Sequence, residues 1–259
     1  MKDILLIYPL LGSMSSVVVD LPLSIIYAAA ESNKSGYDVK LLDLRCIPDW
    51  ESVLIDEIKN EYATVGISVM TGMPLKNSIE ISKIVRKFSP LSKVVWGGPH
   101  PTVLPETINE SYIDYIICGY GSNALKCLAD YLIKKTTNIY DIHSLVYKEN
   151  GKIYSNKRCD KVEKLSFEDL PYDLIDIKSS KYKRGYSGQQ IFSLFTSLGC
   201  PYQCAFCISP AAYKAINGCK WVAYSPEEVV AHIEYIINKY KMKHICFIDD
   251  TCFPDLKRM

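Results

Sequence analysis

The chain has 259 residues, of which 48% are hydrophobic and 23% charged, and its formal net charge is +1. This composition excludes disordered, collagen-like and coiled-coil proteins. Residues 1–150 carry 14 Lys and Arg against 17 Asp and Glu, which gives −3, and residues 151–259 carry 16 against 12, which gives +4. Neither half has the concentrated basic face of a nucleic-acid-binding protein, so we expect no nucleic-acid partner.

The length allows one to two domains. No apolar run reaches the roughly 20 residues that span a bilayer, and the N-terminus lacks the apolar segment of a signal peptide. We therefore expect a cytoplasmic protein with no membrane partner. Ten cysteines are many for that compartment, where disulfides rarely persist, so metal binding or redox chemistry is indicated.

Short apolar runs alternate with segments of helical spacing over the first 135 residues. The predicted strands cover residues 4–8, 39–42, 65–69, 94–96 and 115–118. Each run is nearly continuous in apolar residues, as in parallel strands that are buried on both faces. The pattern predicts an α/β domain over residues 1–140, with a doubly wound, Rossmann-like parallel sheet.

In such a fold, ligands bind at the carboxyl ends of the strands. The loop after the first strand is not a G-x-G-x-x-G turn, which disfavours a dinucleotide. Small residues follow the later strands and permit close approach of the backbone to a ligand, although tight turns without a ligand explain them as well. These candidate residues are Ser68, Thr71, Gly97, Gly98, Gly119 and Gly121.

Residues 141–186 have a different pattern. Asn150-Gly151 between two apolar runs predicts a β-hairpin, and the charged, irregular stretch that follows predicts a surface connector. A buried strand over residues 191–196 then opens a second domain, predicted for residues 187–259. Residues 225–228, Ser-Pro-Glu-Glu, predict the start of a helix with a capping box.

Three cysteines, Cys200, Cys204 and Cys207, follow that strand with C-x3-C-x2-C spacing. Structural zinc sites use four ligands, and ferredoxin loops have C-x2-C-x2-C spacing with a fourth cysteine. Three thiolates in one loop instead indicate an iron–sulfur cluster with one iron open to another ligand. The loop, with Phe206 before the third cysteine, resembles the signature of radical S-adenosylmethionine (SAM) enzymes.

This resemblance implies that the three cysteines hold a 4Fe-4S cluster, at which SAM is cleaved to a 5′-deoxyadenosyl radical. It implies that Phe206 lies beside the adenine of SAM. Asp249 and Asp250 follow the next predicted strand and are SAM-binding candidates, with helix capping or a structural hydrogen bond as the alternative. The second domain is then expected to contain the first βα units of an incomplete (β/α)6 radical SAM barrel.

The N-terminal region resembles the cobalamin-binding domain of the cobalamin-dependent (class B) radical SAM enzymes. Ser68-Val69-Met70 stands where that family has S-x-L, and Gly97-Gly98 follows after 26 further residues where it has a glycine pair. The resemblance implies that the six loop residues contact cobalamin and that the most plausible reaction is methyl transfer. It also implies a reducing partner such as flavodoxin or ferredoxin, while the substrate, a small molecule or a peptide, stays unknown.

Two features depart from the family pattern. The stretch from Asp20 contains no histidine to bind cobalt from below, and Gly119-Tyr120-Gly121-Ser122 stands where relatives often have an acidic G-E-G-E loop. Two alternatives stay open: a non-catalytic, truncated cobalamin and iron–sulfur binding fragment, and a methylthiotransferase-like radical SAM protein. The second requires further cluster cysteines in the N-terminal domain, where the three present are scattered.

Overall fold

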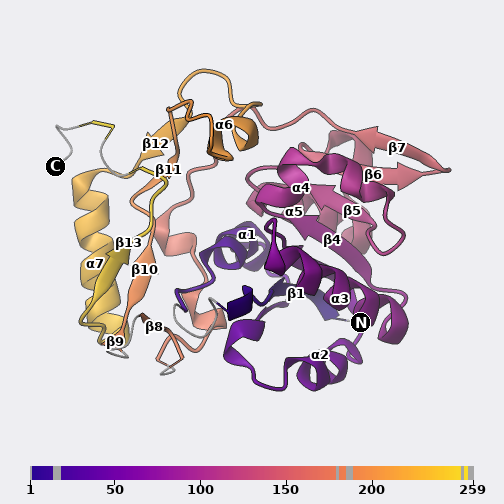
Figure 1. The fold of residues 1–259 in the computed structure, drawn as a ribbon, viewed down its shortest axis with the longest axis horizontal. Coiled ribbons are helices and arrows are strands. Elements are labelled where there is room, and N and C mark those ends of the chain that lie inside the picture. Colours follow the sequence, from indigo (N-terminus) through magenta and orange to yellow (C-terminus); the bar gives the residue numbers. More distant parts are fainter. Residues whose placement is uncertain (1, 14–18, 179–180, 185–188, 252–253, 256–259) are drawn as a thin grey trace.

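A computed structural model describes residues 2–13, 19–178, 181–184, 189–251 and 254–255 (Figure 1). Its centre is a seven-stranded sheet of order β2-β1-β3-β4-β5-β6-β7. The strands are β1 (Lys2–Tyr8), β2 (Val39–Asp43), β3 (Tyr62–Ser68), β4 (Lys93–Gly97), β5 (Tyr115–Ile117), β6 (Leu145–Glu149) and β7 (Lys152–Ser155). The first five are parallel, and their order reverses between β1 and β3, so the carboxyl ends of these two strands flank the switch point where ligands bind in such sheets.

The five strands expected in the N-terminal region are all present, and the doubly wound α/β fold is confirmed. The helices around the sheet are α1 (Leu23–Lys34), α2 (Trp50–Ile58), α3 (Met73–Phe88), α4 (Pro99–Val103) and α5 (Ser122–Ala129). Short 3-10 turns lie at Leu44–Cys46, Pro105–Asn109, Ile139–Asp141, Phe167–Asp169 and Tyr172–Leu174, and a π-helical turn, Asp130–Lys134, continues α5.

Alternation along β1 builds two cores. Ile4 and Leu6 pack with α1 and α5 on one face of the sheet, whereas Leu5 and Ile7 pack with α2 and α3 on the other. All four side chains are at most 3% exposed. Burial on both faces explains why the strand is apolar throughout.

The predicted hairpin extends this sheet at its edge. β6 pairs antiparallel with β5, and β7 pairs with β6. Asn150 and Gly151 both have positive φ, 51° and 74°, as a tight two-residue hairpin turn requires.

The remainder of the chain packs beside the sheet and shares its core on the α1/α5 face. Its elements are β8 (Lys183–Arg184), β9 (Gln189–Gln190), β10 (Phe192–Leu194), β11 (Ser197–Gly199), α6 (Ser209–Ala212), β12 (Trp221–Ala223), α7 (Pro226–Tyr240) and β13 (Ile245–Phe247). β10 and β13 are parallel and are joined through α7, which gives the βα unit expected at the start of a barrel. The capping box at Ser225 and Glu228 is present.

The strand predicted over residues 191–196 is shorter, because β10 ends at Leu194 and a separate strand, β11, begins at Ser197. β10 pairs with β13, whereas β11 turns away and pairs antiparallel with β12. The cause is Asp249, whose carboxylate accepts hydrogen bonds from the backbone of Thr196 and Ser197, at 2.6 and 2.5 Å, between the two strands. In the described part of the chain, no helix is long and apolar enough to cross a membrane.

Candidate functional site

A cavity of about 490 Å³ lies between the carboxyl edge of the sheet and the second part of the chain. Five of the six expected loop residues line it: Ser68, Gly97, Gly98, Gly119 and Gly121. Helices α1 and α5 line it from one face of the sheet, while the end of β11, α6 and Asp250 line it from the other part of the chain. The cavity therefore joins both halves of the chain in one site.

The glycines leave this side of the cavity open. A Cβ atom added to Gly97 would meet only the carbonyl oxygen of Ile117, at 3.9 Å, and one added to Gly119 would meet nothing within 4 Å. Gly119 has a positive φ of 77°, so its backbone also favours glycine. Gly98 is more tightly confined, because its φ is 96° and an added Cβ would approach the Val69 oxygen to 2.9 Å. Gly97 and Gly119 thus give space for a ligand, and Gly98 fixes the loop.

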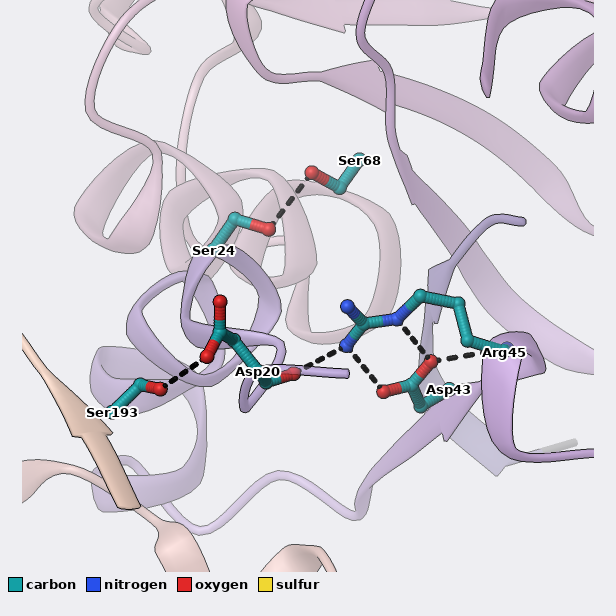
Figure 2. A network of polar contacts seen from close by, with 6 residues as sticks. All are labelled: Asp20, Ser24, Asp43, Arg45, Ser68 and Ser193. Atoms are coloured by element: carbon teal, nitrogen blue, oxygen red, sulfur yellow. Dashed lines mark hydrogen bonds and ion pairs between the residues drawn. The ribbon is translucent and has the colours of Figure 1, made fainter. Parts of the chain in front are cut away.

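Two hydroxyl groups meet on the lining of the cavity. Ser24 in α1 and Ser68 at the end of β3 are hydrogen-bonded, 2.9 Å between their Oγ atoms (Figure 2). Both residues line the cavity. Sequence analysis did not identify Ser24, because its partner lies 44 residues away and no local pattern connects them.

Thr71, the sixth expected residue, is not among the lining residues. Its Oγ1 lies 3.0 Å from Nδ1 of His100, which is buried beside Trp96. Burial lowers the pKa of His100, so the neutral ring is favoured. His100 does not line the cavity either, and no histidine is found among the described residues that do.

The three cysteines of the loop after β11 are accessible. Cys200 is partly exposed, and Cys204 and Cys207 are exposed. Hydrogen bonds with Ser209 lower the pKa of the Cys207 thiol, which favours the thiolate that metals bind. Over the described residues, however, no three Cys, His, Asp or Glu side chains are gathered closely enough to hold a metal ion.

The residues expected to bind SAM occupy different environments. Phe206 is 94% exposed, and Asp249 holds the junction of β10 and β11 through backbone hydrogen bonds and through Thr196 Oγ1, at 2.8 Å. Asp249 thus has the structural hydrogen bonds named as its alternative. The SAM contacts of both residues stay predictions.

Asp250 does line the cavity, in an aromatic setting that sequence analysis did not identify. Its Oδ2 accepts a 2.6 Å hydrogen bond from the hydroxyl of Tyr213. The Tyr213 ring stacks on Tyr120 from the sheet loop, with centroids 6.1 Å apart and an interplanar angle of 12°. Burial raises the pKa of Tyr213, so its hydroxyl stays a donor.

Glu163 brings a second carboxylate to the cavity, from the connector. Its Oε2 and Oε1 accept hydrogen bonds from the backbone of Ser122 and Asn123, at 3.2 and 2.9 Å, in the first turn of α5. Burial raises the pKa of this carboxyl, and the two backbone bonds offset part of the rise. The loop Gly119-Tyr120-Gly121-Ser122, which contains no acidic residue, therefore has an acidic neighbour from elsewhere in the chain.

A polar network connects the two parts of the chain (Figure 2). The Arg45 guanidinium binds Asp43 through two nitrogens, at 2.9 and 2.7 Å, and donates to the backbone oxygen of Asp20, at 2.7 Å. The Asp20 carboxylate accepts a 2.9 Å bond from Ser193 in β10. Asp43 is therefore an ion-pair partner and the cap of the turn at Leu44–Cys46.

A comparison with known protein families matches residues 9–129 to the B12 binding domain. This range contains the loops after all five parallel strands, β1 to β5, including the two that flank the switch point.

Relatives extend the similarity to the whole chain. The chain is 31% identical to an uncharacterised methyltransferase of Pyrococcus horikoshii over 100% of its own length and 55% of the relative's. It is 25% identical to the hopanoid C-2 methylase of Rhodopseudomonas palustris, over 82% of this chain and 36% of that one. The chain thus spans about half or less of the curated relatives it matches.

Solved structures with the same fold include two cobalamin-containing proteins. The radical SAM methyltransferase TsrM of Kitasatospora setae superimposes with a TM-score of 0.71 at 21% identity, over 96% of this chain and 48% of that one. The cobalamin-dependent SAM radical enzyme OxsB gives a TM-score of 0.76 at 20% identity, over 99% and 35%. The resemblance to the cobalamin-dependent radical SAM family is confirmed.

Proposed function

We propose that this chain binds cobalamin and a 4Fe-4S cluster and forms part of a radical SAM methyltransferase. The supporting observation is the single cavity, because it brings the sheet loops Gly97, Gly98 and Gly119 together with Asp250 and with Gly199, the residue before Cys200. A methyl donor on one side and a radical source on the other need such a shared space.

The lining residues fit a large, mostly apolar ligand with amide groups. Small residues open one side of the cavity, and hydroxyl groups of Ser24 and Ser68 supply polar contacts. Of the described lining residues, none carries a basic side chain. Cobalamin fits this lining, and Ser68, Gly97, Gly98, Gly119 and Gly121 would hold it.

The loop after β11 has the donor chemistry for the cluster. Cys200, Cys204 and Cys207 are thiols with access to solvent, and Cys207 has the lowered pKa of a thiolate-forming group. With these groups bound, the cluster and SAM supply a 5′-deoxyadenosyl radical, and cobalamin supplies a methyl group. The residues of this chain would bind, orient and enclose these groups, and Tyr213 holds Asp250 in place at the cavity. The reducing partner would be a flavodoxin or a ferredoxin.

Anaerobic reconstitution with iron, sulfide and hydroxocobalamin, followed by optical spectra, tests the proposal. We expect retained corrin and about four irons per chain, the content of one cubane cluster. Cys200→Ala, Cys204→Ala and Cys207→Ala should each lose iron and keep corrin. Cys46→Ala is the matched control, because Cys46 is a partly exposed cysteine in the turn after β2 and not in the loop. Failure of the wild type to retain corrin would contradict the cobalamin assignment. The iron content would still test the cluster assignment separately.

A further inference from the structure

The carboxylates of the cavity have no cationic counterpart. Glu163 and Asp250 are the Asp and Glu residues among the described lining residues, and Lys, Arg and His are absent from that set. A carboxylate accepts hydrogen bonds and donates none when ionised. Any ligand in the cavity therefore meets acceptors with negative charge at two places.

Glu163 also occupies a backbone feature that attracts anions. At the N-terminus of α5 (Ser122–Ala129), the first N–H groups have no acceptor within the helix, and this end of the helix carries a positive partial charge. Two of these groups, at Ser122 and Asn123, already donate to Glu163. A phosphate at this position would have to displace or face a carboxylate.

The carboxylate keeps acceptor capacity toward the cavity. Its two oxygens each accept one backbone hydrogen bond, and a carboxylate has about four acceptor positions. Because the Glu163 carboxylate is buried, it is unfavourable for its remaining acceptor positions to have no hydrogen bond. A ligand that presents N–H or O–H groups satisfies them.

We propose that Glu163 makes the α5 end of the cavity an acceptor site for uncharged amide or hydroxyl donors of a bound corrin and excludes anionic groups from it. The inference rests on the proposed function and names the chemistry of one contact. It places the ring amides beside Glu163 and the phosphate of the nucleotide tail elsewhere in the cavity.

Two corrin probes separate this role from a purely structural one. Cobinamide keeps the ring amides and lacks the nucleotide tail, whereas cobyrinic acid carries carboxylates in place of the amides. Dissociation constants for both are measured by optical titration with the full chain. The wild type should bind cobinamide more tightly than cobyrinic acid. Glu163→Gln should reduce the ratio of the cobyrinic acid dissociation constant to the cobinamide dissociation constant by about tenfold, the effect of one charge-assisted hydrogen bond.

Glu168→Gln is the matched control, because Glu168 is an exposed glutamate of the same connector and does not line the cavity. It should leave the ratio unchanged. Glu163→Asp keeps the charge and withdraws it by one methylene, so it should weaken cobinamide binding and still disfavour cobyrinic acid. An unchanged ratio in Glu163→Gln, or equal binding of both probes by the wild type, would overturn the inference. If the wild type bound neither corrin, the proposed function would be overturned instead.

Discussion

At the scale of single residues, glycines with similar backbone angles have different tasks. Gly98 and Gly36 have φ of 96° and 81°, where other residues are strained. An added Cβ at Gly98 would lie 2.9 Å from the Val69 oxygen and 3.1 Å from the Val69 nitrogen, whereas at Gly36 it would meet nothing within 4 Å. The positive φ explains both glycines, and the close approach explains only Gly98.

Gly98→Ala should therefore destabilise the chain more than Gly36→Ala. We expect a loss of about 1 kcal/mol in the free energy of unfolding for Gly36→Ala, from the backbone angle alone. For Gly98→Ala the clash should add about 1–3 kcal/mol. Urea unfolding measures both, and equal losses would show that the Val69 backbone moves aside without cost.

Buried His232 makes stability depend on pH. Its ring stacks on Phe167, with centroids 4.0 Å apart, and its Nε2 lies 3.2 Å from the Tyr172 hydroxyl. Burial lowers the pKa of His232 from 6.5 to about 4. Between these values the unfolded chain binds a proton that the folded chain does not, so the free energy of unfolding falls as pH falls through this window.

The loss should reach about 3 kcal/mol at its largest, from the difference between the two pKa values. In His232→Phe, which keeps an aromatic ring beside Phe167, this part of the pH dependence should be absent. His143→Gln is the control, because His143 is exposed. Unfolding free energies measured across the window check this, and the same slope for His232→Phe and the wild type would argue against it.

At the scale of elements, Arg45 forms an ion pair with Asp43 at the end of β2 and connects this end to the segment before α1 by donating to the Asp20 backbone oxygen. Their side chains are 2% and 4% exposed, and the guanidinium lies over the Tyr8 ring, 4.1 Å from its centroid. A buried pair adds little net stability, but removal of one partner leaves an uncompensated charge. The network is therefore sensitive to single substitutions.

Arg45→Met should cost about 3–5 kcal/mol in the free energy of unfolding, because it leaves Asp43 buried without its cation. Lys40→Met is the matched control, since Lys40 is a half-exposed partner of Glu57, and it should cost about 0–1 kcal/mol. Ser193→Ala removes only the contact with Asp20 and should cost about 1 kcal/mol. Chemical denaturation compares the three, and a small loss for Arg45→Met would indicate that water reaches Asp43.

The parallel strands could be predicted because they are buried on both faces and are therefore apolar throughout. The end of β10 at Leu194 and the separate strand β11 could not be predicted, since Phe195 continues the largely apolar run. The Asp249 carboxylate, which accepts hydrogen bonds from the backbone of Thr196 and Ser197, lies more than 50 residues along the chain. The same limit applies to the ion-pair role of Asp43, which depends on Arg45 folding back over Tyr8.

At the scale of the whole molecule, the cavity is lined from both parts of the chain, so a ligand bound there should stabilise both together. Hydroxocobalamin at 100 times its dissociation constant should raise the free energy of unfolding by about 2.7 kcal/mol. Thermal unfolding with and without the ligand measures this, with far-UV circular dichroism as the probe. A ligand that stabilised only part of the transition would show that the two parts unfold separately.

The sequence by itself determined the alternation of strands and helices, the hairpin at Asn150-Gly151, the small residues at strand ends and the spacing of Cys200, Cys204 and Cys207. These features are local, because periodicity, turn chemistry and loop spacing depend on neighbouring residues. Only the tertiary structure decided which of them share a cavity. It placed Ser24 against Ser68, Tyr213 against Asp250, and Glu163 at α5, beside the loop whose own sequence lacks an acid. These pairs are 44, 37 and 41 residues apart, and hydrogen bonds over such separations form only when tertiary packing brings the groups together.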